Sequence, residues 1–475
     1  MENVYKNNGD YTLEKCTLTI GKDDKKTELD LSNIYLDITI YESLHTPFIS
    51  GVITISDNNN LLDFATLGNG ERLNIEFATA GNSTTIKGEY LVYATTTPIR
   101  NNEHSMVYGL QFASHPFIYA KRLRHWNATK EKSFSEVVTD IFKKLQDSYE
   151  GQKKELKATE VENSRHIVFT GHDTMEAIDT CSRYAKSKDG YYAYLFYENN
   201  QEFCFKPIEE LFKQEPLMEY NIAQSGAYSG YGSETTHDAV KSAHEEAFNN
   251  YQDFEFEHTQ NFLDKVMNGL LGATYNFVSL RDRYNLKIPS NAGEFRDNAL
   301  TDNQFMADHI TVNSDGAIYV LPQTQLYGDE ENVVRRDVIL KRNNNVAINI
   351  ATFGNSALKV GDMIKANIPR WHTEMGEDIE VDKYSGLYLI SEIKHVLNRN
   401  AYNTRLKIVR DGFNDKNITV EDKTPEYKEN PDTVKTEYVE STKKEESVLE
   451  KEKQTEKAMY GESESMLDKI KRMFE

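Results

Sequence analysis

The sequence predicts an α+β protein built around two related, small antiparallel β-barrels. A segment occurs twice, at residues 86–112 and 384–410, and the first strand of each copy contains a matching Gly-x-Tyr-Leu-Val/Ile run. Upstream of each copy lies a second match, residues 70–75 against 361–366, each opening with Gly and an acidic residue. Short hairpins can share such features by chance, but equal spacing over about 25 residues together with a second anchor favours an internal duplication.

The ungapped alignment of the two copies fixes which residues correspond. It places Tyr90 on Tyr388 and Asn102 on Asn400. It also places Tyr108 on Leu406 and Leu110 on Ile408. Two similar β-modules in one chain would let three chains present six similar modules around one axis, which points to a ring or tube rather than to an enzyme pocket.

The first barrel is expected within residues 1–115. Ile34, Leu36, Ile38 and Ile40 alternate with more polar residues, which is the period-two pattern of a half-buried strand. Further alternating runs occur at 53–55, 73–77 and 106–112, separated by Asn- and Gly-containing turns. Several short strands without a helical pattern predict a small antiparallel barrel.

Residues 116–215 are predicted to form an α+β module. Ser133 and Glu136 have capping-box spacing before an apolar helical stripe that extends to Leu145. A second helix is expected to start at Asp173, with Glu176 completing its capping box. Residues 191–197 and 202–208 are then expected to pair as a hairpin.

The second barrel is expected to be discontinuous, drawn from residues 216–258 and 336–412. Val346, Ile348 and Ile350 alternate before the turn at Gly361. The intervening residues 259–335 are treated as an inserted region, with one helix expected at about 260–270 and weak periodicity elsewhere.

Residues 413–475 are predicted to be a charged, disordered tail because they contain too little apolar surface to offset the entropy cost of ordering. Its end differs: one face of a short helix would gather apolar side chains, and we assign these as candidate partner-docking residues. They are Met466, Leu467, Ile470, Met473 and Phe474. Docking on a partner and packing back on the same chain both remain open.

Composition limits the function classes. The formal net charge of −21 disfavours specific nucleic-acid binding, since binders neutralise phosphates with Lys and Arg. The acidity either keeps the protein soluble or keeps the wall of a DNA conduit from adhering. No apolar run reaches membrane-spanning length, and residues 1–15 lack the features of a signal peptide. The three cysteines are odd in number and far apart, which favours reduced thiols.

No catalytic, cofactor-binding or metal-binding constellation is expected. His244 and Glu245 do not continue into a zinc-protease motif, and Gly226, Gly230 and Gly232 lack the Lys-Ser/Thr of a phosphate loop. The group of His166, His172, Asp173 and Asp179 lacks further ligands at metal spacing, and its acidic residues suit a helix cap and an exposed face. We therefore predict a protein that is not an enzyme.

Three runs in the second barrel, at 358–364, 388–395 and 402–406, resemble baseplate hub proteins of contractile-tailed phages. The hub portion of type VI secretion spike proteins is similar. Residues 51–57 and 70–73 resemble the first barrel of the same family, and 191–208 fit its middle module. Residues 246–335 match loosely and the tail does not match.

The resemblance implies a structural hub in the tail baseplate of the virion, made in the host cytoplasm. It implies a homotrimer with pseudo-sixfold symmetry that joins the sixfold tail tube to the threefold central spike and forms part of the DNA conduit. Its partners would be the spike protein, tail tube or tube-initiator proteins and other baseplate proteins. The alternatives are a tail-associated cell-wall hydrolase, which would turn over purified peptidoglycan, and a distal-tail or receptor-binding adaptor.

Overall fold

The structure is a computed structural model that describes residues 9–21, 26–58, 61–79, 84–102, 105–222, 250–258, 262–270, 272–279, 283–290, 318–323, 328–368 and 384–412. These residues belong to one compact unit, Met1–Lys416. Within these ranges, no helix combines the length and the apolar character needed to cross a membrane. The predicted tail lies outside the described residues.

The second barrel is closed by six strands. They are β16 (Glu219–Ile222), β17 (Asn250–His258), β21 (Val346–Phe353), β22 (Met363–Ala366), β23 (Gly386–Asn398) and β24 (Tyr402–Arg410). The order around the barrel is β23-β22-β16-β17-β21-β24, and β24 pairs back with β23. Alternate apolar residues of these strands, such as Ile348, Ile350 and Ile390, fill the interior.

The first barrel repeats this order. Its main strands are β1 (Tyr11–Ile20), β3 (Tyr35–Ser43), β4 (Ser50–Asp57), β5 (Glu71–Thr79), β6 (Thr85–Thr95) and β8 (Ser105–Ser114), with short β2 (Thr27–Asp30) and β7 (Ile99–Asn102) at the margins. The order is β1-β5-β6-β8-β4-β3. No ladder between β1 and β3 is seen in the described ranges. The Tyr11 hydroxyl of β1 instead contacts the Tyr35 hydroxyl of β3 (2.6 Å), and Leu31 N, in the segment between β2 and β3, donates to Cys16 O (2.8 Å).

The two barrels share connectivity as well as spatial order. Taken along the chain, β1, β3, β4, β5, β6 and β8 occupy the places of β16, β17, β21, β22, β23 and β24. The neighbouring pairs run in the same sense, except that β1 is antiparallel to β5 whereas β16 is parallel to β22. The prediction of two homologous barrels is confirmed. In strand pairing, the described copies differ at β1 and β16, because β16 also pairs with β17 whereas β1 forms no described ladder with β3.

Local geometry supports the duplication residue by residue. Gly70 and Gly361 both have φ near +90°, a conformation that favours glycine. Gly70 N donates to Val92 O at 2.8 Å, and Gly361 N donates to Ile390 O at 3.0 Å. A register shift follows directly in each copy, after Val92 and after Ile390. These matches place Tyr90 on Tyr388, as the sequence predicts.

One part of the ungapped alignment is wrong. Val92 pairs with Phe112, whereas its counterpart Ile390 pairs with Ile408. Phe112, and not Leu110, therefore corresponds to Ile408. The connection from β6 to β8 is two residues longer than the β23–β24 turn. Because side chains alternate between the two faces of a strand, a shift of two residues keeps the same set of side chains facing the barrel interior.

The middle module packs helices against a small sheet. Its helices are α2 (His115–Arg122), α3 (Phe134–Asp147), α4 (Thr174–Tyr184) and α5 (Ile208–Leu211). Its strands are β9 (Arg124–His125), β10 (Ala128–Ser133), β11 (Leu156–Ala158), β12 (Ser164–Val168), β13 (His172–Asp173), β14 (Tyr194–Glu198) and β15 (Phe203–Pro207). Both predicted capping boxes form, at Ser133–Glu136 and Asp173–Glu176, and β14 pairs with β15 as the expected hairpin.

Three further elements differ from the sequence-based expectation. A single helical turn, α1 (Leu61–Phe64), lies in the first barrel, where Asp57 accepts a hydrogen bond from Leu61 N at 2.7 Å. The inserted region holds the sheet β19-β18-β20 (Tyr284–Ser290, Ala273–Ser279, Ile318–Gln323) beside the expected helix α7 (Phe262–Met267). Helix α8 (Glu330–Asn343) occupies 336–343, which had been assigned to the barrel. The other unit boundaries stay a prediction.

Candidate functional site

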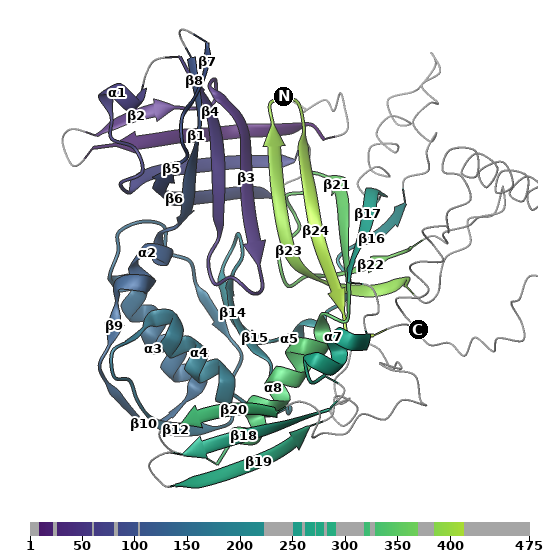
Figure 1. Ribbon diagram of the computed structural model, residues 1–475. Helices are drawn as coiled ribbons and strands as arrows, with labels where there is room; N and C mark the ends of the chain where they lie inside the picture. Colours follow the sequence, from purple (N-terminus) through teal and green to yellow (C-terminus); the bar gives the residue numbers. More distant parts are fainter. Residues whose placement is uncertain are drawn as a thin grey trace, which may run out of the picture. The chain divides into compact units, whose positions relative to one another are not determined.

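The most distinctive site joins the two barrels. Strand β3 of the first barrel pairs antiparallel with β23 of the second, in a register that places Ile40 opposite His395 and Asp37 opposite Asn398. The ladder runs from Asp37 to Ser43, and the hydrogen bond from Leu44 N to Ser391 O (2.9 Å) extends it. Figure 1 shows β4, β3, β23 and β24 side by side at this joint. The two barrels thereby share one continuous sheet.

Apolar side chains from each barrel enter the core of the other. Leu397 and Tyr402 of the second barrel are fully buried among first-barrel residues, and the Tyr402 ring meets Phe77 edge to face at 5.3 Å. In the other direction, Leu44 at the end of β3 is buried in the second core. Burial of apolar area is the main favourable term in such contacts, so the joint is a packed core and not only a strand ladder.

Charged groups are buried at the same joint. Glu42 of β3 and His395 of β23 are 2% and 0% exposed, with 3.9 Å between Glu42 Oε1 and His395 Nε2. The middle module adds an ion pair: Lys154 Nζ lies 2.8 Å from Glu198 Oε1 and also donates to Asn199 O. Glu198 Oε2 accepts from Ile49 N at 3.0 Å, which ties the β3–β4 loop to this pair.

Burial decides the ionisation of this cluster. Loss of solvent raises the pKa of Glu42 to about 7; the cation of Lys154 and the backbone amides of Val360 and Asn200 oppose the rise, and Glu198 adds to it. Burial lowers the pKa of His395 to about 3, so the imidazole is neutral, and its Nδ1 lies 2.7 Å from the Tyr402 hydroxyl. One buried cation thus faces two carboxyl groups, and Glu42, which is not the one paired with Lys154, has a raised pKa.

This arrangement holds the two barrels and the middle module together. The four groups come from both barrels and the middle module, and solvent does not reach them. None of the four was predicted as a site residue. A sequence signal was present for Glu42, because the alternation that points Ile38 and Ile40 inward points Glu42 inward as well.

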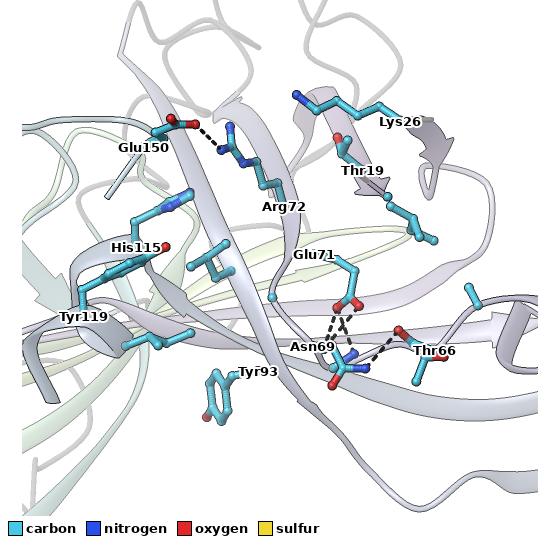
Figure 2. Close-up of a pocket in the computed structure, with 17 residues that line it drawn as sticks. Thr19, Lys26, Thr66, Asn69, Glu71, Arg72, Tyr93, His115, Tyr119 and Glu150 are labelled. Atoms are coloured by element: carbon cyan, nitrogen blue, oxygen red, sulfur yellow. Dashed lines mark hydrogen bonds and ion pairs between the residues drawn. The ribbon is translucent and has the colours of Figure 1, made fainter. Parts of the chain in front are cut away.

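A pocket of 940 Å³ lies on the first barrel, between the β1–β2 hairpin, the loop before β5 and helix α2. Leu91, Ile118 and Tyr119 supply apolar lining. Figure 2 shows Arg72 directed at Glu150 and Glu71 directed at Asn69. The pocket is therefore lined by both apolar and charged side chains.

Glu71 and His115 of the pocket already have structural partners. The Glu71 carboxylate accepts from Gly68 N at 2.9 Å and from Asn69 N at 3.0 Å, so it holds the glycine-containing loop. His115 is buried, and loss of solvent lowers its pKa although Glu89 Oε1 lies 3.1 Å from its Nε2. The pocket geometry favours a structural role for these side chains.

The candidate chemical residues take structural positions where they are described. Asp173 caps α4 by accepting from Glu176 N at 2.8 Å, and Asp179 pairs with Arg183 on an exposed face. His172 Nδ1 accepts from Thr170 N at 3.2 Å. Within the described residues, no group of three or more His, Cys, Asp or Glu is arranged to hold a metal ion.

Several sequence-based candidates lie outside the described residues. These are the His244–Glu245 pair, the glycines at 226, 230 and 232, and the five docking residues Met466, Leu467, Ile470, Met473 and Phe474.

Comparison with known proteins bears on the fold. No family model matches the chain, and no curated protein matches it. Among solved structures, the tail protein from Neisseria meningitidis MC58 aligns with a TM-score of 0.50 and 9% identity over 84% of this chain and 96% of that chain. The chain has the fold of this tail protein.

Two further solved structures are similar. The 43 kDa tail protein of prophage MuSo2 from Shewanella oneidensis aligns with a TM-score of 0.48 and 8% identity over 83% of this chain and 98% of that chain. An E. coli component of the type VI secretion system aligns with a TM-score of 0.41 and 9% identity over 84% and 76%. The resemblance expected from the sequence is confirmed at the level of fold.

Proposed function

We propose that the protein is the structural hub of a contractile phage tail baseplate. Three chains would form a ring of six barrels that joins a sixfold tail tube to a threefold central spike. The observation that carries this proposal is the pair of barrels with equal strand order, fused by β3 and β23 into one sheet. The tail-protein fold supports it. Such a ring needs no catalytic group, and we propose a non-enzymatic role.

The ring would form part of the conduit for DNA. A net charge of −21 would keep passing phosphates from adhering to it, although the same charge also serves solubility. Side chains of β17, β23 and β24 carry both signs: Lys407 of β24 lies 2.8 Å from Glu257 of β17 and 3.8 Å from Glu392 of β23. Partners would be the spike protein, tail tube or tube-initiator proteins and other baseplate proteins in the virion, with synthesis in the host cytoplasm.

The oligomeric state tests the proposal directly. We expect a mass of about three times 54.6 kDa for the assembled protein by light scattering. Because a hub can assemble only on a partner, the measurement is repeated after co-expression with the neighbouring tail proteins. A chain that is monomeric in both preparations would contradict the proposed ring.

The end of the tail is proposed to dock one of these partners through Met466, Leu467, Ile470, Met473 and Phe474. Deletion of residues 460–475 is expected to leave the trimer intact and to weaken one partner contact, as measured by co-purification. A matched control replaces Met466, Ile470 and Phe474 with serine. Unchanged recovery of every baseplate partner by both variants would reject docking.

A further inference from the structure

Each barrel has two strands on opposite sides that are suited to joining neighbours. In the first barrel, β3 and β6 are separated by two strands in either direction around the order β1-β5-β6-β8-β4-β3. In the second barrel, β17 and β23 are separated in the same way. Strands β3 and β23 already make the joint within the chain. Their counterparts in the duplication, β17 and β6, lie on the two outer sides of the fused pair.

Strand β23 divides its outer edge between two neighbours. Its first part pairs with β22 as far as Leu389, and its second part, from Glu392 to Asn398, pairs with β3. Strand β6 pairs with β5 as far as Val92. Beyond that point, Ala94 and Thr95 of β6 and then Ile99 and Arg100 of β7 pair inward with β8. No described strand occupies the outer edge of residues 94–100.

The outer edge at 94–100 is prepared for a ladder. Thr96 N donates inward to Gly109 O at 2.8 Å, so by alternation the N–H of Thr97 points outward. Pro98 has no N–H to donate to a ladder, and the pairing with β8 shifts by one residue between Thr95 and Ile99. Ile99 is 69% exposed beside this edge. An exposed strand edge of this kind is a template for pairing with another chain.

Strand β17 offers the complementary edge. In β3, the pairing with β4 shifts register between Tyr35 and Asp37; in β17, the pairing with β21 shifts between Tyr251 and Asp253. The same Tyr-x-Asp pattern and the same bulge identify β17 as the counterpart of β3. On its other side β17 pairs with β16 only at Asn250 and Tyr251, and no described strand lies along 253–258.

We infer that residues 253–258 of one copy pair antiparallel with residues 94–100 of a second copy, repeating between chains the β3–β23 joint seen within the chain. This rests on the proposed ring. Transferring the internal register places Glu255 opposite Pro98, as Thr39 lies opposite Val396. It also places Asp253 opposite Arg100, a pair of opposite charges in a cross-strand position. Such a head-to-tail contact closes into a ring when the rotation between neighbouring chains is a whole fraction of a turn, and otherwise builds an open filament.

Cysteine cross-linking tests the register. The variant Pro98→Cys/Glu255→Cys is oxidised in the full chain; the three native cysteines are buried. Facing cross-strand positions lie within disulfide reach. We expect most of the protein to run as covalent dimers and trimers on a denaturing gel. The internal counterpart Thr39→Cys/Val396→Cys is the positive control and should close within one chain without a gain in mass.

A second variant distinguishes cross-links formed by specific strand pairing from cross-links formed by random collision of chains. Lys87 is exposed on the half of β6 already paired with β5, so Lys87→Cys/Glu255→Cys should give little cross-linking. A trimer by mass with no link through Pro98 and Glu255 would overturn the strand pairing and leave the proposed hub standing. Equal yields from the two variants would also overturn it. A monomer without links, alone and with its tail partners, would overturn both proposals.

Discussion

Replacing Lys154 with methionine is expected to lower the free energy of unfolding by about 3–5 kcal/mol, because it leaves a buried carboxylate without its cation. The Lys154 and Glu198 side chains are 8% and 2% exposed, and Glu42 lies in the same buried cluster. Removal of Lys154 also removes the hydrogen bond to Asn199 O. Urea unfolding followed by tyrosine and tryptophan fluorescence measures the loss.

Lys87→Met provides the matched control. Lys87 lies 2.9 Å from Glu76, but its side chain is 68% exposed. Water screens such a pair, so its loss should cost less than about 1 kcal/mol. A double variant, Lys154→Met/Glu198→Gln, should recover part of the stability because no lone charge is left in that pair. Similar losses from Lys154→Met and Lys87→Met would contradict the buried-charge explanation.

Replacing Glu42 with glutamine is expected to raise stability at pH 8 and to flatten its dependence on pH. The folded-state pKa of Glu42 is raised to about 7 from 4.5, so the folded protein binds this proton more tightly than the unfolded chain. Below pH 4.5 both states hold the proton and the carboxyl group contributes no difference. As pH rises from 4.5 to 7 stability falls, and above 7 the cost is constant at about 3 kcal/mol.

Unfolding curves from pH 5 to pH 8 check this prediction. The wild type should lose stability over this range relative to Glu42→Gln, and amide exchange should localise the change to the β3–β23 ladder. Glu76→Gln is the control, since Glu76 sits at a partly exposed surface pair. A constant difference between wild type and Glu42→Gln across the range would show that Glu42 does not titrate there.

Much of the fold followed from local patterns in the sequence. The Gly-x-Tyr-Leu repeat around Tyr90 and Tyr388 predicts corresponding strands, and these strands do share their pairing and bulge. The capping boxes at Ser133 and Asp173 predict helix starts because each carries its own hydrogen-bond partner three residues on.

The elements missed by sequence reasoning lack such local signals. Helix α8 begins at Glu330, its N-cap residue Asp329 makes no side-chain cap bond, and its buried Val334 and Val338 lie among charged residues in the sequence. The joint pairs Asp37 with Asn398, so the two strands are remote in sequence, and no pattern within either strand identifies its partner. The buried Lys154–Glu198 pair depends on that tertiary packing and could not be found before it.

The two barrels differ most at one connection. Between β3 and β4 the chain needs only residues 44–49, whereas between β17 and β21 it adds α7, the β19-β18-β20 sheet and α8. In the proposed ring, a partner protein that contacts only barrel strands would find six nearly equivalent binding sites. A neighbour that contacts the added sheet would meet three. An insertion at a single turn is thus enough for the same ring to offer six sites to one partner and three sites to another.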